Sequence, residues 1–318
     1  MRVLGIPLLL AVVAGLMLGN TVAAHDGHDP HELAPSVIKV ANLVPFVKIT
    51  EETDRYIIES NAIPSHETGQ FPNRANPNAI AAQDITKYVT KLPQKSDVPI
   101  DVKMPGIAVN GVLFEPGTAE CFGQQRQRGG GASSQRQQQK AKKGSGVRPP
   151  RGPRDNSGQG ARRLRGKGAS CDWREEAIVK GVGRLGLDRS NAHVQPSGLY
   201  HYHGIPLGLV AQLIPDANGL VHIGYAADGH FIFVDPKRKF QSSWRLKSGV
   251  RPSGPLGVYD GTYTQDFVYQ AGSGELDECN GMVFQGRYIY ILTESFPYVP
   301  RCLKGKPDPS FSRSKGRQ

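Results

Sequence analysis

Two histidines alternate with two tyrosines in the stretch Gly198–Pro206, which reads GLYHYHGIP. Successive side chains of a β-strand point to opposite faces, so His201 and His203 would share one face and the tyrosines the other. The two imidazoles would lie roughly 6–7 Å apart along the strand, close enough to bind one ion through nitrogens at about 2.0–2.1 Å. Because the unperturbed pKa of imidazole is near 6.5, both rings can be neutral ligands at pH 7.

A third histidine, His193, lies upstream across a turn predicted for Gln195–Gly198. A short β-hairpin there would bring its ring beside the other two. Three protein ligands with an open fourth position is the arrangement of catalytic zinc, and imidazole also suits copper and iron. The alternative is that His201 and His203 are surface or hydrogen-bonded structural histidines in a strand that favours tyrosine.

Four further residues are candidates for the same site. His66, in the turn-rich segment IPSHETG, would be either a fourth ligand or an exposed loop histidine. Asp277 and Glu278 precede a tight turn, and Asp228 stands in an Asp-Gly turn between two apolar runs. If the site is catalytic, one of these carboxylates could orient a histidine or act as general base on a metal-bound water.

The N-terminus is typical of an export signal. Arg2 precedes an unbroken apolar run over Val3–Leu18, and the small residues Ala23 and Ala24 follow. This pattern predicts a cleaved signal peptide over residues 1–24. An uncleaved anchor is the alternative, but the run is shorter than the about 20 apolar residues of a spanning helix. We therefore expect a secreted or periplasmic protein with no membrane span after cleavage.

Cleavage there would leave a His/Asp-rich tail over residues 25–35, with His25, His28 and His31 spaced by three. A terminal histidine presents an α-amino group and an imidazole together, and that pair can hold copper when another histidine completes the site. The alternative is an exposed, mobile tail with weak and unspecific metal affinity.

The four cysteines, Cys121, Cys171, Cys279 and Cys302, fit an oxidising compartment. Four cysteines allow three pairings, and chain order suggests Cys121–Cys171 and Cys279–Cys302. The sequence contains no C-x-x-C pair, which argues against a cysteine-rich zinc site and against a thioredoxin-like dithiol.

The formal net charge of +11 is concentrated in one segment. Residues 122–168 hold 13 Lys or Arg and one acid, whereas the rest of the chain has 26 basic against 27 acidic residues. Because the segment is rich in Gly, Gln, Ser and Arg and poor in apolar side chains, we expect a disordered basic insert over residues 122–170. The alternative is a loop that binds an extracellular polyanion. Residues 303–318 are predicted to form a second, weaker basic tail.

Short apolar runs bounded by Pro, Gly, Asn or Asp predict strands through most of the remaining chain. Asp228-Gly229, Asn110-Gly111 and Asp260-Gly261 predict tight turns, the first inside a hairpin. A short helix is predicted to begin at Asp172, with Glu175 three residues on. The expected fold is mainly β, with short strands and hairpins in a sandwich- or barrel-like domain, few short helices and disulfide staples.

Several unusual sequence motifs follow one another along the chain: HVQPSGLYHYHGIP, IGYAADGHFIFV, YDGTYTQDFVY, LDECNGM and YIYILTESFPYVPRC. Together they resemble the YHYH-domain family of exported proteins. The resemblance runs from about Ser36 to Cys302, which implies one β-rich domain built from residues 36–121 and 171–302, with the insert outside the family pattern. It implies extent and location rather than a particular reaction.

Familiar catalytic signatures, such as G-x-S-x-G, H-E-x-x-H and the phosphate-binding glycine motifs, are absent from the sequence. The sequence therefore predicts an exported YHYH-domain protein that binds a divalent transition metal, zinc or copper, through His193, His201 and His203. One alternative is a metal-dependent extracellular hydrolase or oxidase with the same ligands. Another is a non-catalytic module that binds a glycan or polyanion and whose histidines are structural.

Overall fold

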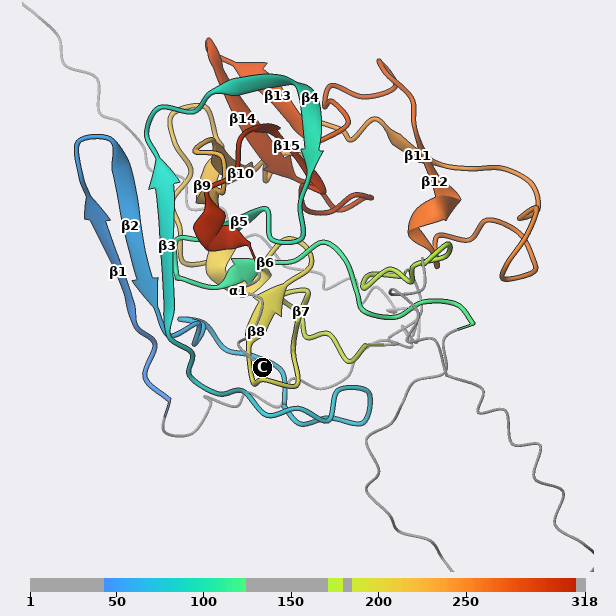
Figure 1. Ribbon diagram of the computed structural model, residues 1–318, viewed down its shortest axis with the longest axis horizontal. Coiled ribbons are helices and arrows are strands. Elements are labelled where there is room, and N and C mark those ends of the chain that lie inside the picture. The colour runs from blue at the N-terminus through green and yellow to red at the C-terminus, as the bar shows by residue number, and fades with distance from the viewer. Residues whose placement is uncertain (1–42, 124–170, 180–184, 313–318) are drawn as a thin grey trace, which may run out of the picture. The chain divides into compact units, whose positions relative to one another are not determined.

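The computed structural model describes residues 43–123, 171–179 and 185–312 (Figure 1). These residues belong to one compact unit of the chain. The predicted signal peptide, the His/Asp-rich tail and nearly all of the basic insert lie outside the described residues, and so does the polyanion site predicted for that insert. No helix in the described ranges is long and apolar enough to cross a membrane.

The described part of the chain is mainly β, as predicted, and is built around one curled, half-barrel sheet. Eight strands follow the order β13-β14-β10-β9-β5-β6-β8-β7. The pairs β14/β10 and β6/β8 are parallel, and the other neighbours are antiparallel. In sheet order the strands are Gly281–Phe284, Arg287–Leu292, Phe231–Val234, Val221–Ala226, Gly106–Ala108, Leu113–Phe114, Tyr200–Tyr202 and Ala192–Val194.

Three smaller sheets and a few helical turns complete the described residues. An antiparallel meander, a pair formed by β4 with β15, and a pair formed by β11 with β12 make up the smaller sheets. The meander consists of β1 (Val47–Glu51), β2 (Arg55–Ser60) and β3 (Ile85–Thr90). One pair is formed by β4 (Lys95–Asp101) with β15 (Cys302–Gly305), and the other by β11 (Trp244–Leu246) with β12 (Phe267–Tyr269). The helical segments are α1 (Leu207–Val210) and the 3-10 turns Thr264–Asp266 and Pro309–Phe311.

The histidine-bearing strand β8 runs through the main apolar core. Tyr200 and Tyr202 are fully buried, and so is Phe114 on the neighbouring strand β6. All three residues of β8 are buried, so both of its faces are covered. Because protein interiors are close-packed, a strand covered on both sides holds its side chains in fixed positions. This rigidity suits a site that needs several atoms aimed at one point.

Glycine turns join the strands where the sequence predicts them. Asp228-Gly229 connects β9 to β10, and Asn110-Gly111 connects β5 to β6. Gly229 has a φ of +96°, and a Cβ there would lie 2.4 Å from the Thr90 carbonyl oxygen. Only glycine fits a position that is both left-handed and this close to another backbone. The third predicted turn, Asp260-Gly261, lies in the loop between β11 and β12, and Gly261 also has a positive φ of +84°.

Both disulfides pair as chain order suggests. One joins Cys121 to Cys171 at the two ends of the basic insert, and the other joins Cys279 to Cys302. No free cysteine occurs among the described residues. The sulfur atoms are therefore committed to structural bonds and not to a metal site or a nucleophile.

The helix predicted to begin at Asp172 is absent from the described residues 172–179, which form bends and isolated bridges. Arg174 pairs with Cys121 in one of these bridges, and the disulfide from Cys121 to Cys171 ties the same two segments together. This tertiary pairing overrides the local helix signal, which is only a weak preference.

The basic tail predicted over residues 303–318 is wrong for its described part, residues 303–312. The strand β15 starts at Cys302 and continues into that range, where it pairs with β4. Leu303 is fully buried and Phe311 is 4 % exposed. The domain therefore extends beyond residue 302, because strand pairing and apolar burial outweigh the basic composition that suggested a tail.

Candidate metal centre

The hairpin of β7 and β8 positions the histidines. Antiparallel pairing sets His193 directly opposite His201. The turn is closed by the Gly198 N–H, which donates to the Gln195 carbonyl at 2.8 Å, and Gly198 has a φ of +87°. Beyond β8, the His203 N–H donates back to the chain just before β7 at 2.8 Å. The predicted hairpin is confirmed, and it carries all three side chains.

The three imidazoles meet on one face of this hairpin, and we call His193, His201 and His203 the three-histidine group. One nitrogen from each ring lies within 4.8 Å of the others. The ring centroids are 4.7–4.8 Å apart. His201 and His203 are each 2 % exposed, and His193 is partly buried. Within the described residues, this is the one cluster of three or more His, Cys, Asp or Glu side chains that could hold a metal ion.

Main-chain carbonyls hold the outer nitrogens of two rings. His193 Nδ1 donates to the Leu185 carbonyl at 3.0 Å, and His201 Nδ1 donates to the Leu199 carbonyl at 3.2 Å. With the proton on Nδ1, the lone pair of each ring lies on Nε2. Metal-binding histidines almost always use this arrangement, because the second hydrogen bond fixes the tautomer and the ring orientation.

A hydrogen bond joins the other side of the group. The Nε2 atoms of His203 and His193 are 3.0 Å apart. Since His193 carries its proton on Nδ1, its Nε2 accepts this bond and His203 Nε2 donates it. The Nδ1 of His203 is then a buried nitrogen with no hydrogen-bond partner. A divalent cation held by both Nε2 atoms would replace the proton that now lies between them.

Burial favours the neutral form of His193 and His203. Desolvation lowers the pKa of His193, although the bond to Leu185 acts in the opposite direction. Burial also lowers the pKa of His203 well below 6.5, and the neighbouring His201 and His193 lower it further. Neutral imidazole is the form that binds metal, so these pKa shifts favour ligation near pH 7.

A carboxylate that the sequence did not indicate lies beside the group. The parallel pairing of β6 with β8 sets Leu113 next to His201, and the Glu115 N–H donates to the Tyr202 carbonyl at 2.9 Å. Glu115 Oε2 is 3.6 Å from His201 Nε2, and the side-chain amide of Gln195 donates to the same oxygen. Glu115 directly follows the apolar run GVLF, but only the pairing of two distant strands brings it to the histidines.

Two separations between candidate ligand atoms are close to those around a tetrahedral ion. Metal–nitrogen bonds of about 2.0–2.1 Å in a tetrahedron place neighbouring ligand atoms roughly 3.3–3.4 Å apart. The separation of 3.0 Å between His193 and His203 and that of 3.6 Å between His201 and Glu115 lie on either side of this value. Three neutral nitrogens and a nearby carboxylate are also a donor set that zinc and copper accept.

The comparison with known families adds one finding. A family model described as YHYH protein matches residues 88–305. The chain belongs to the YHYH protein family. The matched range covers more than half of the 318 residues and contains the three-histidine group, Glu115 and both disulfides. The expected resemblance is confirmed for this range, while residues 36–87 precede it. Neither the curated proteins nor the solved structures gave a significant match.

The tyrosines of the YHYH motif occupy the face of β8 opposite the histidines. The Tyr202 hydroxyl donates to His66 Nε2 at 2.7 Å and accepts from Asn110 Nδ2 at 2.9 Å. The other nitrogen of His66 donates to a main-chain carbonyl at 2.8 Å. Tyr200 donates to Asp188 at 2.7 Å. His66, predicted as a fourth ligand, is therefore hydrogen-bonded on the tyrosine face of β8 and does not lie with the three-histidine group.

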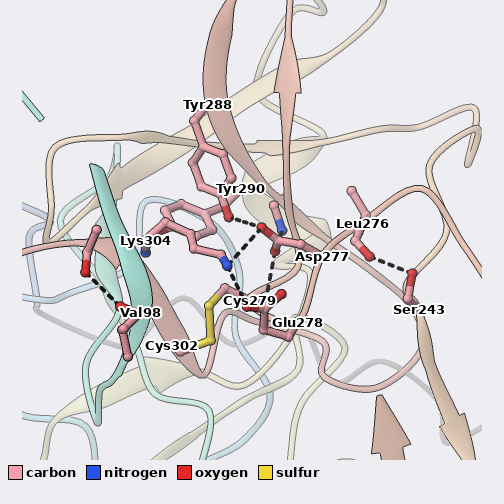
Figure 2. Close-up of polar contacts among 12 residues, drawn as sticks. Val98, Ser243, Leu276, Asp277, Glu278, Cys279, Tyr288, Tyr290, Cys302 and Lys304 are labelled. Carbon is pink, nitrogen blue, oxygen red and sulfur yellow. Dashed lines mark hydrogen bonds and ion pairs between the residues drawn. A yellow bond between two sulfur atoms is a disulfide. The ribbon is translucent and has the colours of Figure 1, made fainter. Parts of the chain in front are cut away.

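Asp277 and Glu278, predicted as acid–base candidates, lie with β13, β14 and β15, at the other end of the sheet order of this YHYH protein (Figure 2). Asp277 Oδ2 accepts the Tyr288 hydroxyl at 2.7 Å. Glu278 Oε1 binds Lys304 Nζ at 2.5 Å. An open cleft beside them is lined by Asp277, Tyr288 and Lys304, and by none of the three histidines.

Asp228, the third carboxylate candidate, is enclosed by hydrogen bonds. Its Oδ2 accepts the Tyr290 hydroxyl at 2.7 Å and the Gly305 N–H at 3.0 Å. The side chain is fully buried, and burial raises its pKa above 3.8 although these bonds act in the opposite direction. Asp228 therefore ties the β9–β10 turn to β14 and β15, which is a structural task.

Proposed function

We propose that this YHYH protein is an exported protein that binds a divalent transition metal through His193, His201 and His203. The observation that carries the proposal is the convergence of three imidazoles, two buried and one partly buried, with their nitrogens within 4.8 Å of one another. The convergence sets the Nε2 atoms of His193 and His203 3.0 Å apart, where a cation could take the place of the proton that now joins them.

Zinc and copper are the metals we propose. Imidazole nitrogen suits both, and the described cysteines are committed to disulfides, so thiolate ligands that would select other centres are not available. The buried and rigid setting on β8 supports a dedicated site rather than an adventitious surface pair.

Two features support export. The predicted signal peptide over residues 1–24 addresses the chain to the secretory route. Two disulfides join all four cysteines, and such bonds persist in oxidising compartments. We therefore propose that the metal is bound in the periplasm or outside the cell.

Metal binding is better supported than turnover. The carboxylates predicted for acid–base chemistry, Asp277, Glu278 and Asp228, have hydrogen-bond partners on β14 and β15 and not on the three-histidine group. Glu115 is the carboxylate that lies beside the group, and whether it acts as a ligand or as a general base separates metal binding from turnover. A role in binding a glycan or polyanion through the basic insert stays a prediction, because the insert lies outside the described residues.

The test is stoichiometric metal binding by the purified protein. The starting protein carries His25→Ala, His28→Ala and His31→Ala, because the N-terminal histidines would otherwise compete for the ion. We expect about one zinc or copper ion per chain by mass spectrometry of the metal content after dialysis. The additional double substitution His201→Ala/His203→Ala should abolish this ion.

The matched control is His222→Phe. This ring packs among Tyr225, Phe231 and Phe233 on β9 and β10, away from the three-histidine group, so phenylalanine should preserve both the fold and the ion. A folded protein that takes up neither zinc nor copper would contradict the proposal. Equal metal content in the double variant and in the control would do so as well.

A further inference from the structure

We propose that Glu115 is the fourth ligand, so that the centre is a closed site of three histidines and one glutamate that retains its ion without an open coordination position. This inference rests on the proposed metal-binding function and adds the residue that decides whether the site can also bind a substrate. No sequence pattern indicated Glu115.

The sheet register places Glu115 on the correct face. Leu113 and Phe114 of β6 lie beside His201 and Tyr202 of β8, so the next residue along, Glu115, lies beside His203. Because side chains alternate between the two faces of a sheet, Glu115 faces the same side as the histidines. The strand β8 therefore has His193 of β7 on one flank and, on the other, Glu115, which directly follows β6.

The contacts bring the carboxylate within ligand range. Its Oε2 is 3.6 Å from His201 Nε2, close to the separation of roughly 3.3–3.4 Å between neighbouring ligands of a tetrahedral ion. The Gln195 amide donates to this oxygen, and the Glu115 N–H is bonded to the Tyr202 carbonyl. Both ends of the residue are thus fixed, which is the support that metal-binding carboxylates usually receive from a second shell.

Charge balance favours the same assignment. The Glu115 side chain is 13 % exposed, so its carboxylate lies in the same sheltered region as the histidine nitrogens. Three neutral imidazoles leave a divalent ion with its full charge, and one carboxylate halves it.

The closed and open alternatives give different chemistry at the metal. An open fourth position holds water, which azide can replace, whereas a site closed by Glu115 offers no position to a small anion. If Glu115 acted instead as general base on a metal-bound water, the site would be open and would accept azide. This difference can be measured on the native side chains and does not depend on the folding of any variant.

The first experiment uses cobalt(II) as the probe in the protein that lacks the three N-terminal histidines. The visible absorption of bound cobalt reports its coordination, and azide is then added. We expect the spectrum of the native site to be unchanged by azide. An azide-dependent spectrum overturns the closed site. If the protein takes up no cobalt and no zinc, the proposed function itself fails, and that outcome is distinct from failure of the Glu115 assignment.

The second experiment compares Glu115→Gln with the matched variant Glu120→Gln. Glu120 is a carboxylate whose charge raises the pKa of His193, so its substitution controls for the loss of a nearby negative charge. Loss of an outer-shell partner weakens metal affinity about 10–100-fold, and loss of a direct ligand should cost at least the upper end of that range. We expect zinc affinity to fall about 100-fold or more in Glu115→Gln, with cobalt becoming azide-sensitive, and to fall less than about tenfold in Glu120→Gln.

Zinc affinity in Glu115→Gln that stays within tenfold of the native value, together with an unchanged cobalt spectrum, overturns the assignment. Far-ultraviolet circular dichroism shows whether this variant is folded. If it is not, Gln195→Ala replaces it, because that change releases the carboxylate while leaving the strands intact. We expect Gln195→Ala to weaken zinc binding about 10–100-fold, and an unchanged affinity contradicts the proposal.

Discussion

The two ends of the eight-stranded sheet both bury polar side chains, but they arrange them differently. At the β13–β14 end, each carboxylate meets a donor. Asp277 meets Tyr288 and Glu278 meets Lys304 (Figure 2). Asp228 likewise meets Tyr290. At the β7–β8 end, three imidazoles face one another, and one of their outer nitrogens has no partner. We call these the carboxylate end and the histidine end.

This difference in hydrogen bonding predicts different roles for the two ends, stability at the carboxylate end and metal binding at the histidine end. A buried polar group that is fully hydrogen-bonded contributes to stability, and removing its partner is expensive. A cluster of buried imidazoles contributes little to stability until a cation binds, and metal binding is the function that we propose for the histidine end. Substitutions at the carboxylate end should therefore lower stability, and substitutions at the histidine end should lower metal affinity.

The largest stability effect is expected for Asp228→Ala. This change leaves the buried Tyr290 hydroxyl and the Gly305 N–H without their acceptor. We expect the free energy of unfolding in denaturant to fall by about 2–4 kcal/mol, with metal stoichiometry unchanged. The variant Asp228→Asn keeps one acceptor oxygen and should lose less. A loss of bound metal in folded Asp228→Ala would contradict the assignment of metal binding to the histidine end alone.

Zinc itself should stabilise the protein through the histidine end. A ligand that binds only the folded state adds about 2.7 kcal/mol when its free concentration is 100 times its dissociation constant. We expect an increase of this size in the free energy of unfolding on adding zinc, and its removal by a chelator. His201→Ala/His203→Ala should gain nothing. Should that variant be stabilised as strongly as the native protein, zinc must act elsewhere.

The two faces of β8 allow the same contrast between stability and metal binding to be tested within one strand. His66→Ala removes the acceptor of the buried Tyr202 hydroxyl and should lower the free energy of unfolding by about 1–3 kcal/mol. Metal content should not change, because His66 lies on the tyrosine face. Ser65→Ala, at an exposed neighbour bonded to Gln212, is the matched control and should cost less than about 0.5 kcal/mol. Metal loss in His66→Ala would return it to the ligand set.

The smallest effect concerns the partly exposed ion pair of Glu278 with Lys304. Partial burial raises the pKa of Glu278, but the hydrogen bond and charge of Lys304 outweigh it, so the pKa lies below 4.5. A carboxyl group with a lowered folded-state pKa stabilises the protein above about pH 4.5, and this contribution is lost as the pH falls through the lowered value. The pair should contribute less than about 1 kcal/mol.

Lys304→Met tests whether the ion pair with Glu278 stabilises the protein above pH 4.5 and loses this effect in acid. We expect the stability of the variant to fall less steeply than that of the native protein as the pH is lowered below 4.5, as measured by denaturant unfolding at a series of pH values. Zinc affinity at neutral pH should be the same in both proteins. A steeper acid loss in the variant would mean that the ion pair does not set the pKa of Glu278.

Local patterns were sufficient to predict the histidine end in part. Alternation along a strand put His201 and His203 on one face, and a glycine turn predicted the hairpin that adds His193. Glu115 could not be predicted, because it reaches the site through the parallel pairing of β6 with β8, which are separated by the whole insert. Non-local pairing also explains the errors at Asp172 and beyond residue 302, where distant strands override local composition.

The carboxylate candidates illustrate the same limit. Asp277, Glu278 and Asp228 were residues of the right chemical type, but the sequence does not reveal the strand order of the sheet. That order places β13 and β14 at one end and β7 and β8 at the other. The pairing of the four cysteines followed simple chain order because each bond closes a segment between two neighbours in sequence.

The bond between Cys121 and Cys171 has a consequence for proteolysis. Glu115 precedes the basic insert and the three histidines follow it, so the proposed centre draws on both sides of a segment rich in trypsin-type cleavage points. A peptide-bond cut between the two cysteines would divide the polypeptide while leaving its two pieces covalently joined. Nicked material should therefore run as one band without reductant, separate into two with it, and keep its ion until then.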